Sequence, residues 1–192
     1  LLWFGWFGFN GFSQLAMGTF DDVNAINKIA VNTHLAGSAG VVTGAVLTRL
    51  LGGKTDIIMM LNGALAGLVA ITAEPLTPTP FVAIVIGSIG SIIMYFGTKF
   101  LERLQLDDVV GAIPVHMFAG IFGTLAVPIT NPDTNFGTQF QGTISVCIFS
   151  FILSYIVFKA LKKTIGLRIS KEAEKLGTDK AEVGVIAYSI RD

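Results

Sequence analysis

Three side chains near the start of the chain have the types and the spacing of a cation-binding site. Trp6, Phe9 and Ser13 occupy positions i, i+3 and i+7 of the segment GWFGFNGFS, so a helix would place them on one face. Aromatic faces attract ammonium-type cations, and a hydroxyl oxygen accepts a hydrogen bond from an N–H donor. The same stripe is also typical of an aromatic helix face packed against lipid or core. We expect Asn10, in the same segment, to bond a neighbouring helix rather than a solute.

Two histidines lie within apolar segments, His116 in AIPVHMFAGIFG and His34 in AVNTHLAGSAG. An ionisable group in such a segment is costly to bury, which favours a functional role. A neutral imidazole has one donor and one acceptor nitrogen, so it can bond a small polar ligand or relay a proton. The alternative is a neutral imidazole bonded to a neighbouring helix. The pattern leaves both interpretations open for each histidine.

Several other chemistries lack the residues that they need. No lysine lies in the middle of an apolar segment, and no series of carboxylates crosses one. Cys147 is the single cysteine, which excludes an intramolecular disulfide and every multi-cysteine metal motif. We find no nucleophile motif or phosphate loop, so we predict neither an enzyme nor a bound cofactor or metal. The acidic residues Glu74, Asp107 and Asp108 lie at the ends of apolar segments, where capping is expected.

The elements that must position these residues are long and apolar. Of the 192 residues 52% are hydrophobic and only 14% are charged, whereas soluble domains carry about 25% charged residues. The net charge is zero, which gives no argument for nucleic acid as a partner. Each of six apolar stretches approaches the ~20 residues that cross a bilayer as a helix; they are residues 1–20, 29–51, 57–73, 81–101, 109–129 and 140–161.

The segments between these stretches have turn or loop compositions, namely DDVNAINK, LGGKTD, EPLTPTP, ERLQLDD and TNPDTN. Glycine and alanine recur within the stretches, as in LAGSAGVVTGA, and small residues let helix backbones approach closely. The alternation of a membrane barrel is missing. We therefore predict an all-α membrane protein, a polytopic helix bundle in contact with the lipid bilayer.

Basic residues predict the orientation of the bundle. They follow the second, fourth and sixth stretches, whereas the other connections contain only Lys28 beside two aspartates. Since cytoplasmic connections are rich in lysine and arginine, we predict a transmembrane domain at residues 1–162 and a cytoplasmic tail at residues 163–192. No basic leader precedes Leu1, so we expect no signal peptide and expect the chain to be part of a longer protein.

Five segments, in order, resemble the ammonium transporter family (Amt/Mep, related to Rhesus proteins). They are GWFGFN with Ser13, AVNTHLAG, LNGALAGLVAIT, DDVVGAIPVHMFAGIFGTL and IGLRISKEAEKLGTDKAEVGVIAY. The resemblance covers essentially the whole chain. It implies the last six of the eleven transmembrane helices of that fold, and a homotrimer in the cell (plasma) membrane with one hydrophobic pore in each protomer.

The resemblance also implies roles for four residues. Phe9 matches a phenylalanine of the pore gate, Ser13 the hydroxyl of the outer ammonium site, Trp6 a pore-lining tryptophan and His116 the second of two pore histidines. The other gate phenylalanine and the first histidine are expected in a part of the fold that this sequence does not include. His34 does not match the first histidine. The implied substrate is ammonium or ammonia, with methylammonium as an analogue.

The sequence departs from the family pattern in places. Pro114 and Met117 flank the Val-His pair, Gly111 replaces a frequent acidic residue, Phe12 adds bulk beside Ser13, and Val183 replaces a histidine of the tail. Ammonium transport through a pore with an aromatic gate and a pore histidine is the favoured function. An ammonium sensor that signals through its tail, and a non-conducting structural subunit, remain as alternatives. A PII-type regulatory protein is the partner that the family implies for the tail.

Overall fold

The computed structural model describes residues 1–187, and these residues form helices and connections without any strand. Two compact units can be distinguished, one at Leu1–Ile144 and one that begins at Ser145. The boundary lies inside a helix rather than at its end. The predicted division of the chain at residues 162 and 163 stays a prediction.

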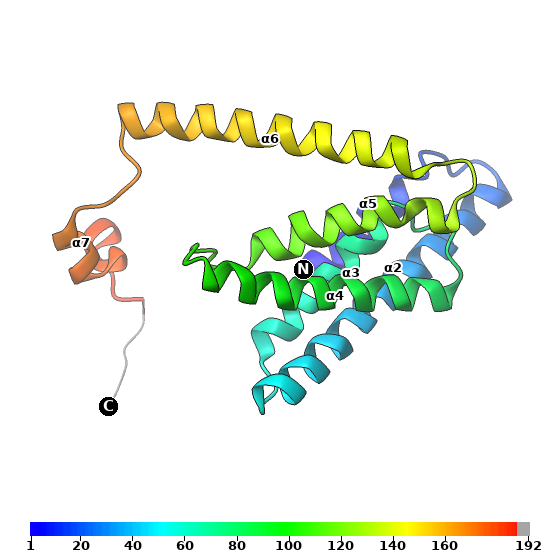
Figure 1. Ribbon diagram of the computed structural model, residues 1–192, viewed down its shortest axis with the longest axis horizontal. Helices are drawn as coiled ribbons and strands as arrows, with labels where there is room; N and C mark the ends of the chain where they lie inside the picture. Colours follow the sequence, from blue (N-terminus) through cyan, green and yellow to red (C-terminus); the bar gives the residue numbers. More distant parts are fainter. Residues whose placement is uncertain (188–192) are drawn as a thin grey trace. The chain divides into compact units, whose positions relative to one another are not determined.

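The first unit is a bundle of antiparallel helices (Figure 1). Its elements are α1 (Leu2–Phe12), α2 (Phe20–Gly52), α3 (Ile57–Thr72), α4 (Pro80–Arg103), a π-helical segment η1 (Ile113–Phe118), α5 (Ala119–Thr130) and the start of α6 (Phe136–Thr164). Each of the six apolar stretches contains helical structure. Four helical segments of residues 1–187 are long and apolar enough to cross a membrane: Phe20–Gly52, Pro80–Arg103, Ile113–Thr130 and Phe136–Thr164.

The ends of the helices differ from the sequence prediction where capping groups act. We expected the second helix to begin near residue 29, after a DDVNAINK loop, but α2 begins at Phe20. Thr19 and Asp22 form a reciprocal capping box, so this polar segment becomes the first turns of the helix. The loop prediction was therefore wrong. Similarly, α1 ends at Phe12 instead of spanning residues 1–20, and Leu15 has a left-handed backbone with φ of 60°.

Three helices meet at a junction built from small residues. In α2, α3 and α4 alike, two of these residues are separated by four positions, which places them one turn apart on one helix face. All six are buried. We call this set the small-residue junction: Ala36, Gly40, Gly63, Gly67, Gly87 and Ser91.

The backbones touch directly at this junction. A Cβ atom on Gly40 would collide with the carbonyl oxygen of Gly63, and one on Gly87 with the carbonyl oxygen of Ala36. The Ser91 hydroxyl donates a hydrogen bond of 2.9 Å to the carbonyl oxygen of Gly40. The contacts confirm the close helix approach that the glycine and alanine pattern predicted.

The second unit contains the rest of α6, the short helix α7 (Lys171–Leu176) and the π-helical turn η2 (Asp179–Val183). The Asp179 carboxylate accepts a hydrogen bond of 3.0 Å from the Ala187 backbone. This bond, with a second from the Lys180 backbone, holds the pKa of Asp179 below its ordinary value. The family-like tail segment that ends at Tyr188 reaches one position beyond the described residues.

Candidate functional site

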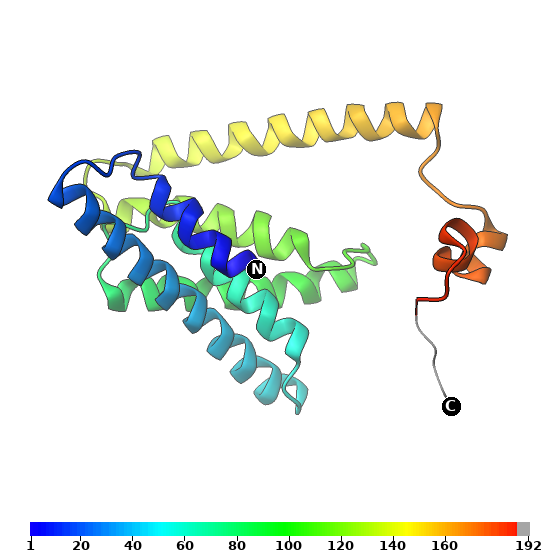
Figure 2. The same ribbon diagram turned by 180° about the vertical axis from the view of Figure 1, so that it is seen from behind.

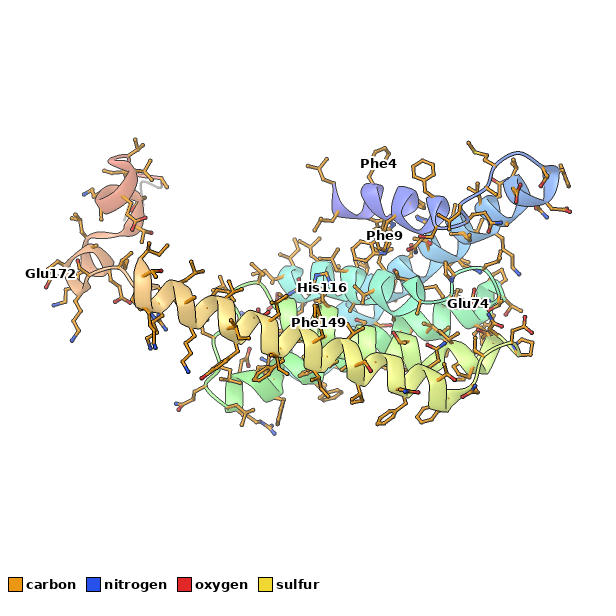
Figure 3. All side chains as sticks on the ribbon, turned by 90° about the horizontal axis from the view of Figure 1, so that it is seen from above. Phe4, Phe9, Glu74, His116, Phe149 and Glu172 are labelled. Atoms are coloured by element: carbon orange, nitrogen blue, oxygen red, sulfur yellow. The ribbon has the colours of Figure 1, made fainter. Side chains whose placement is uncertain are left out.

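Trp6, Phe9 and His116 line one cavity of ≈ 680 Å³ on the first unit. The walls come from α1, α3, η1 and α5, and they are mostly apolar. We call it the aromatic cavity; its other lining residues are Leu1, Leu2, Gly5, Val69, Thr72, Ala73, Gly120 and Thr124. In Figure 3, Phe9 lies on the side of α1 that faces His116, whereas Phe4 lies on the opposite side.

The α1 helix runs beside α2 (Figure 2) and contributes two aromatic rings to the cavity. The rings of Trp6 and Phe9 meet edge to face, with centroids 6.2 Å apart. One turn further, Asn10 is 1% exposed, and its amide donates a hydrogen bond of 2.9 Å to the Thr33 hydroxyl of α2. The expectation that Asn10 bonds a neighbouring helix is thus confirmed, and the bond fixes the end of α1.

The Trp6 ring is also held from a second helix. Its indole N–H donates a hydrogen bond of 2.7 Å to the Thr72 hydroxyl at the end of α3. The Thr72 hydroxyl in turn donates to the carbonyl oxygen of Leu68, at 2.7 Å. Sequence reasoning missed Thr72; the available signal was a hydroxyl at the end of an apolar helix that contains no other polar residue after Asn62.

Ser13, the fourth predicted site residue, lies outside the aromatic cavity. It caps the end of α1, and its hydroxyl donates a hydrogen bond of 2.8 Å to the carbonyl oxygen of Phe9. Ser13 is exposed, and its oxygen still has acceptor capacity for an N–H donor. Ser13 therefore lies one helical turn after Phe9, at the C-terminal cap of α1 and outside the cavity.

His116 belongs to η1, whose π-helical turn presents the imidazole to the cavity. The apolar stretch that contains His116 was predicted to begin at residue 109, but η1 begins only at Ile113, so His116 lies in the first turn. The rings of His116 and Trp6 are stacked, with centroids 6.5 Å apart and planes 15° apart. No hydrogen bond to an imidazole nitrogen of His116 is found among residues 1–187, and the side chain lines the cavity.

The start of η1 is fixed by a carboxylate and a glycine. Asp108 accepts hydrogen bonds from the backbone N–H groups of Ala112 and Ile113, at 2.9 and 2.8 Å, which is the capping role expected of it. Gly111 has φ of 74°, and a Cβ there would lie 2.7 Å from the Asn62 amide nitrogen. Glycine at this position, a departure from the family pattern, therefore follows from the backbone of this turn.

His34 has surroundings of a different kind. It is exposed on α2, and its ring lies 5.6 Å from that of Trp3 and 6.2 Å from that of Phe7. It does not line the aromatic cavity. The two histidines therefore have different surroundings, since His34 lies near two rings of α1 and His116 lines a cavity.

Groups that could hold a metal ion are scarce in this unit. Residues 1–187 contain no cluster of three or more histidine, cysteine or acidic side chains with suitable geometry. The chemistry of the cavity is limited to two aromatic faces, two threonine hydroxyls and one imidazole. Such a set suits a small cation with N–H bonds, or its neutral conjugate base.

The family comparison covers nearly the whole chain. A model described as the Ammonium Transporter Family matches residues 1–188. The chain is 41% identical over 208 residues to ammonium transporter Amt2 of Archaeoglobus fulgidus, which covers 98% of this chain and 44% of Amt2. It is 38% identical over 188 residues to a putative ammonium transporter of Synechocystis sp., with coverage of 96% and 42%. The chain thus spans less than half the length of these two relatives.

Solved structures show the same fold. A structure named Sensor Amt Protein superposes with a TM-score of 0.85 at 35% sequence identity, covering 94% of this chain and 46% of the other. Mep2 of Candida albicans superposes with a TM-score of 0.79 at 27% identity, covering 95% and 44%. These similarities support the helical fold predicted from the five sequence segments.

Proposed function

The chain belongs to the ammonium transporter family, and we propose that its aromatic cavity forms one wall of a hydrophobic pore for ammonium. The observation that carries the proposal is the meeting of Trp6 and Phe9 of α1 with His116 of η1 in one cavity, from two separate parts of the chain. The cavity is open on one side. The relatives of this chain are about twice as long as the chain itself. We expect further transmembrane helices to form the opposite wall.

The aromatic rings supply the first step. Ammonium is strongly hydrated, and its transfer as a bare ion into an apolar pore is costly. The faces of Phe9 and Trp6 offset part of this cost through cation–π attraction, which is about 2 kcal/mol or more for a desolvated cation. Ser13, exposed at the end of α1, retains acceptor capacity for an N–H bond on the approach to these rings.

His116 supplies the second step. Loss of a proton converts ammonium into neutral ammonia, which passes an apolar wall far more easily than the ion. An imidazole with both nitrogens unbonded can accept a hydrogen bond from ammonia or transfer a proton. Potassium has no proton to lose, so this route excludes it.

The wider arrangement extends the same proposal. We expect a homotrimer in the plasma membrane, a transmembrane domain at residues 1–162, and a cytoplasmic tail at residues 163–192. The basic residues after the second, fourth and sixth stretches support this orientation. A PII-type protein is the regulator that we expect at the tail.

Potassium and ammonium fluxes of His116 variants test the pore assignment. In proteoliposomes, H116L should lose most ammonium flux because it removes both imidazole nitrogens. H116D should admit potassium, because a carboxylate in the apolar section stabilises a bare cation, while ammonium flux persists or rises. H34L is the matched control, since His34 lies outside the cavity, and it should conduct like the native protein. If H116D excludes potassium and conducts ammonium normally, the proton-relay assignment is wrong.

An ammonium sensor is the second candidate, favoured by the similarity to the structure named Sensor Amt Protein. A sensor would bind ammonium in the same cavity and change the tail without sustained flux. Hydrogen exchange at residues 163–187, measured with and without methylammonium, separates the two functions when flux is recorded on the same preparation. Ligand-dependent exchange without flux would favour the sensor.

A further inference from the structure

The end of α6 carries a groove that the transport proposal does not use. The groove has a volume of ≈ 570 Å³ and lies wholly within the second unit. Three of its six lining side chains are lysines and two are aromatic; they are Tyr155, Phe158, Lys159, Lys162, Lys163 and Leu167. The spacing of three and four residues places the helical members on one side of α6.

The end of the helix shapes the groove. The backbone N–H groups of Ile165 and Gly166 both donate to the carbonyl oxygen of Leu161, at 3.1 and 3.0 Å. Gly166 has φ of 84°, a left-handed conformation that glycine adopts without strain. The chain leaves the helix axis at this point, which brings Leu167 to the lysines instead of continuing the helix.

The charge of the groove is uncompensated within the described chain. No carboxylate lines it, and the single ion pair found in residues 1–187 joins Lys99 to Glu102, in the first unit. Lys159 instead lies over the Tyr155 ring, with its ammonium nitrogen 5.2 Å from the centroid and 3.4 Å from the hydroxyl oxygen. The groove therefore offers three ammonium groups and a phenol hydroxyl to an anion.

The groove also lies where α6 changes from apolar to basic. The helix is apolar enough to cross a membrane, and its lysines are confined to the last turns. Tyrosine and lysine at the end of an apolar helix are typical of the headgroup level of a bilayer. Phosphate accepts several hydrogen bonds, which suits lysine ammonium groups, and acyl chains suit the rings and Leu167.

We propose that this groove binds the phosphate-bearing headgroup of an anionic phospholipid, in the leaflet where α6 ends. Lys159, Lys162 and Lys163 pair with the phosphate, and the Tyr155 hydroxyl adds a hydrogen bond at the same depth. The first acyl segment of the lipid packs against Phe158 and Leu167. The site does not depend on the aromatic cavity or on ammonium transport.

Native mass spectrometry of the detergent-purified protein with defined lipids tests the site. Phosphatidylglycerol should bind with a first dissociation constant at least tenfold lower than phosphatidylcholine with the same acyl chains. The triple variant K159Q/K162Q/K163Q should abolish this preference, since glutamine keeps the helix propensity and removes the charge. Y155L should reduce the preference about threefold.

A matched triple variant controls for net charge. Lys171, Lys175 and Lys180 lie in the same unit but outside the groove, so K171Q/K175Q/K180Q should keep the tenfold preference. Equal loss of preference in both triples would overturn the proposal in favour of nonspecific attraction. Equal binding of the two lipids by the native protein would overturn it outright. Displacement of phosphatidylglycerol by equimolar glycerol phosphate would also overturn it, since the ligand would then be a soluble phosphate.

Discussion

The two sides of α3 are built from side chains of different size, and they have different tasks. Toward α2 and α4, Gly63 and Gly67 let the backbones touch at the small-residue junction. Toward α1 and α5, Val69 and Thr72 line an open cavity whose shape depends on side chains. The comparison indicates that a helix fixed by backbone contacts on one side can present a defined wall on the other.

Rigidity of the junction matters because the cavity depends on positions of single atoms. The Trp6 ring is oriented by one hydroxyl of α3. His116 is oriented by a helical turn whose first backbone N–H groups are capped by the Asp108 carboxylate. If α3 shifted against α2, the Thr72 hydroxyl would move with it. The cavity geometry thus rests on the helix packing behind it.

The largest effect is expected from an added methyl group at the junction. In G40A the new Cβ would collide with the carbonyl oxygen of Gly63, a backbone atom that cannot rotate away. Overpacking of this kind costs up to about 3 kcal/mol, and the Ser91 hydrogen bond to Gly40 would be strained as well. Thermal unfolding in detergent should show a Tm several degrees below native.

The control for this variant is G52A, at the end of the same helix. A Cβ on Gly52 would meet no atom within 4 Å, so its Tm should stay near the native value. An unchanged Tm for G40A would show that α2 and α3 are not held by backbone contact at this level, and the contrast between the two sides of α3 would be lost.

A smaller effect is expected from the hydrogen bond on the cavity side. T72V keeps the shape of the side chain but leaves the Trp6 indole N–H without its partner, at a cost of about 1–3 kcal/mol. The freed ring should also misalign the cavity, so the half-saturation concentration for methylammonium uptake should rise about threefold. Restoration of both quantities by T72S would assign the effect to the hydroxyl.

Thr124 provides the matched control on α5. It lines the same cavity and also donates to a carbonyl oxygen one turn back, that of Gly120 at 3.0 Å, but it receives no bond from Trp6. T124V should therefore change stability by less than about 0.5 kcal/mol and change uptake less than T72V does. Equal effects of T72V and T124V would contradict a positioning role for Thr72.

The helices and their close packing could be predicted from the sequence, whereas their ends could not. Apolar composition and recurrent small residues indicate helices in contact, and the buried bond of Asn10 follows from its polarity in such a helix. The start of α2 depends on a capping box between Thr19 and Asp22, which outweighs the loop composition of the segment that follows.

The sequence indicated three residues that share the aromatic cavity, but not the geometry that brings them together. Trp6, Phe9 and His116 were identified from residue type and family resemblance, and the cavity brings them together. The π-helical turn at His116 also makes a distant contact that local patterns do not reveal, because Phe118 packs where Gly97 of α4 has no side chain. The Thr72 bond to Trp6 joins residues 66 positions apart, which local patterns do not reveal. The role of Ser13 at an outer ammonium site stays a prediction.

The smallest effect is expected when a methyl group is added to a glycine on the cavity side. In G120A the new Cβ would lie 3.5 Å from a methyl carbon of Val69, an ordinary van der Waals distance. Alanine is also favoured over glycine inside a helix by about 1 kcal/mol. The Tm of G120A should therefore equal or slightly exceed that of the native protein, in contrast to G40A. The added methyl narrows the cavity, so methylammonium uptake should fall by less than twofold. A Tm loss as large as that of G40A would show that α5 packs on α3 at Gly120 as tightly as it does at Gly123, where a Cβ would collide with the carbonyl oxygen of Ala70. An open cavity wall could then not be maintained beside Val69.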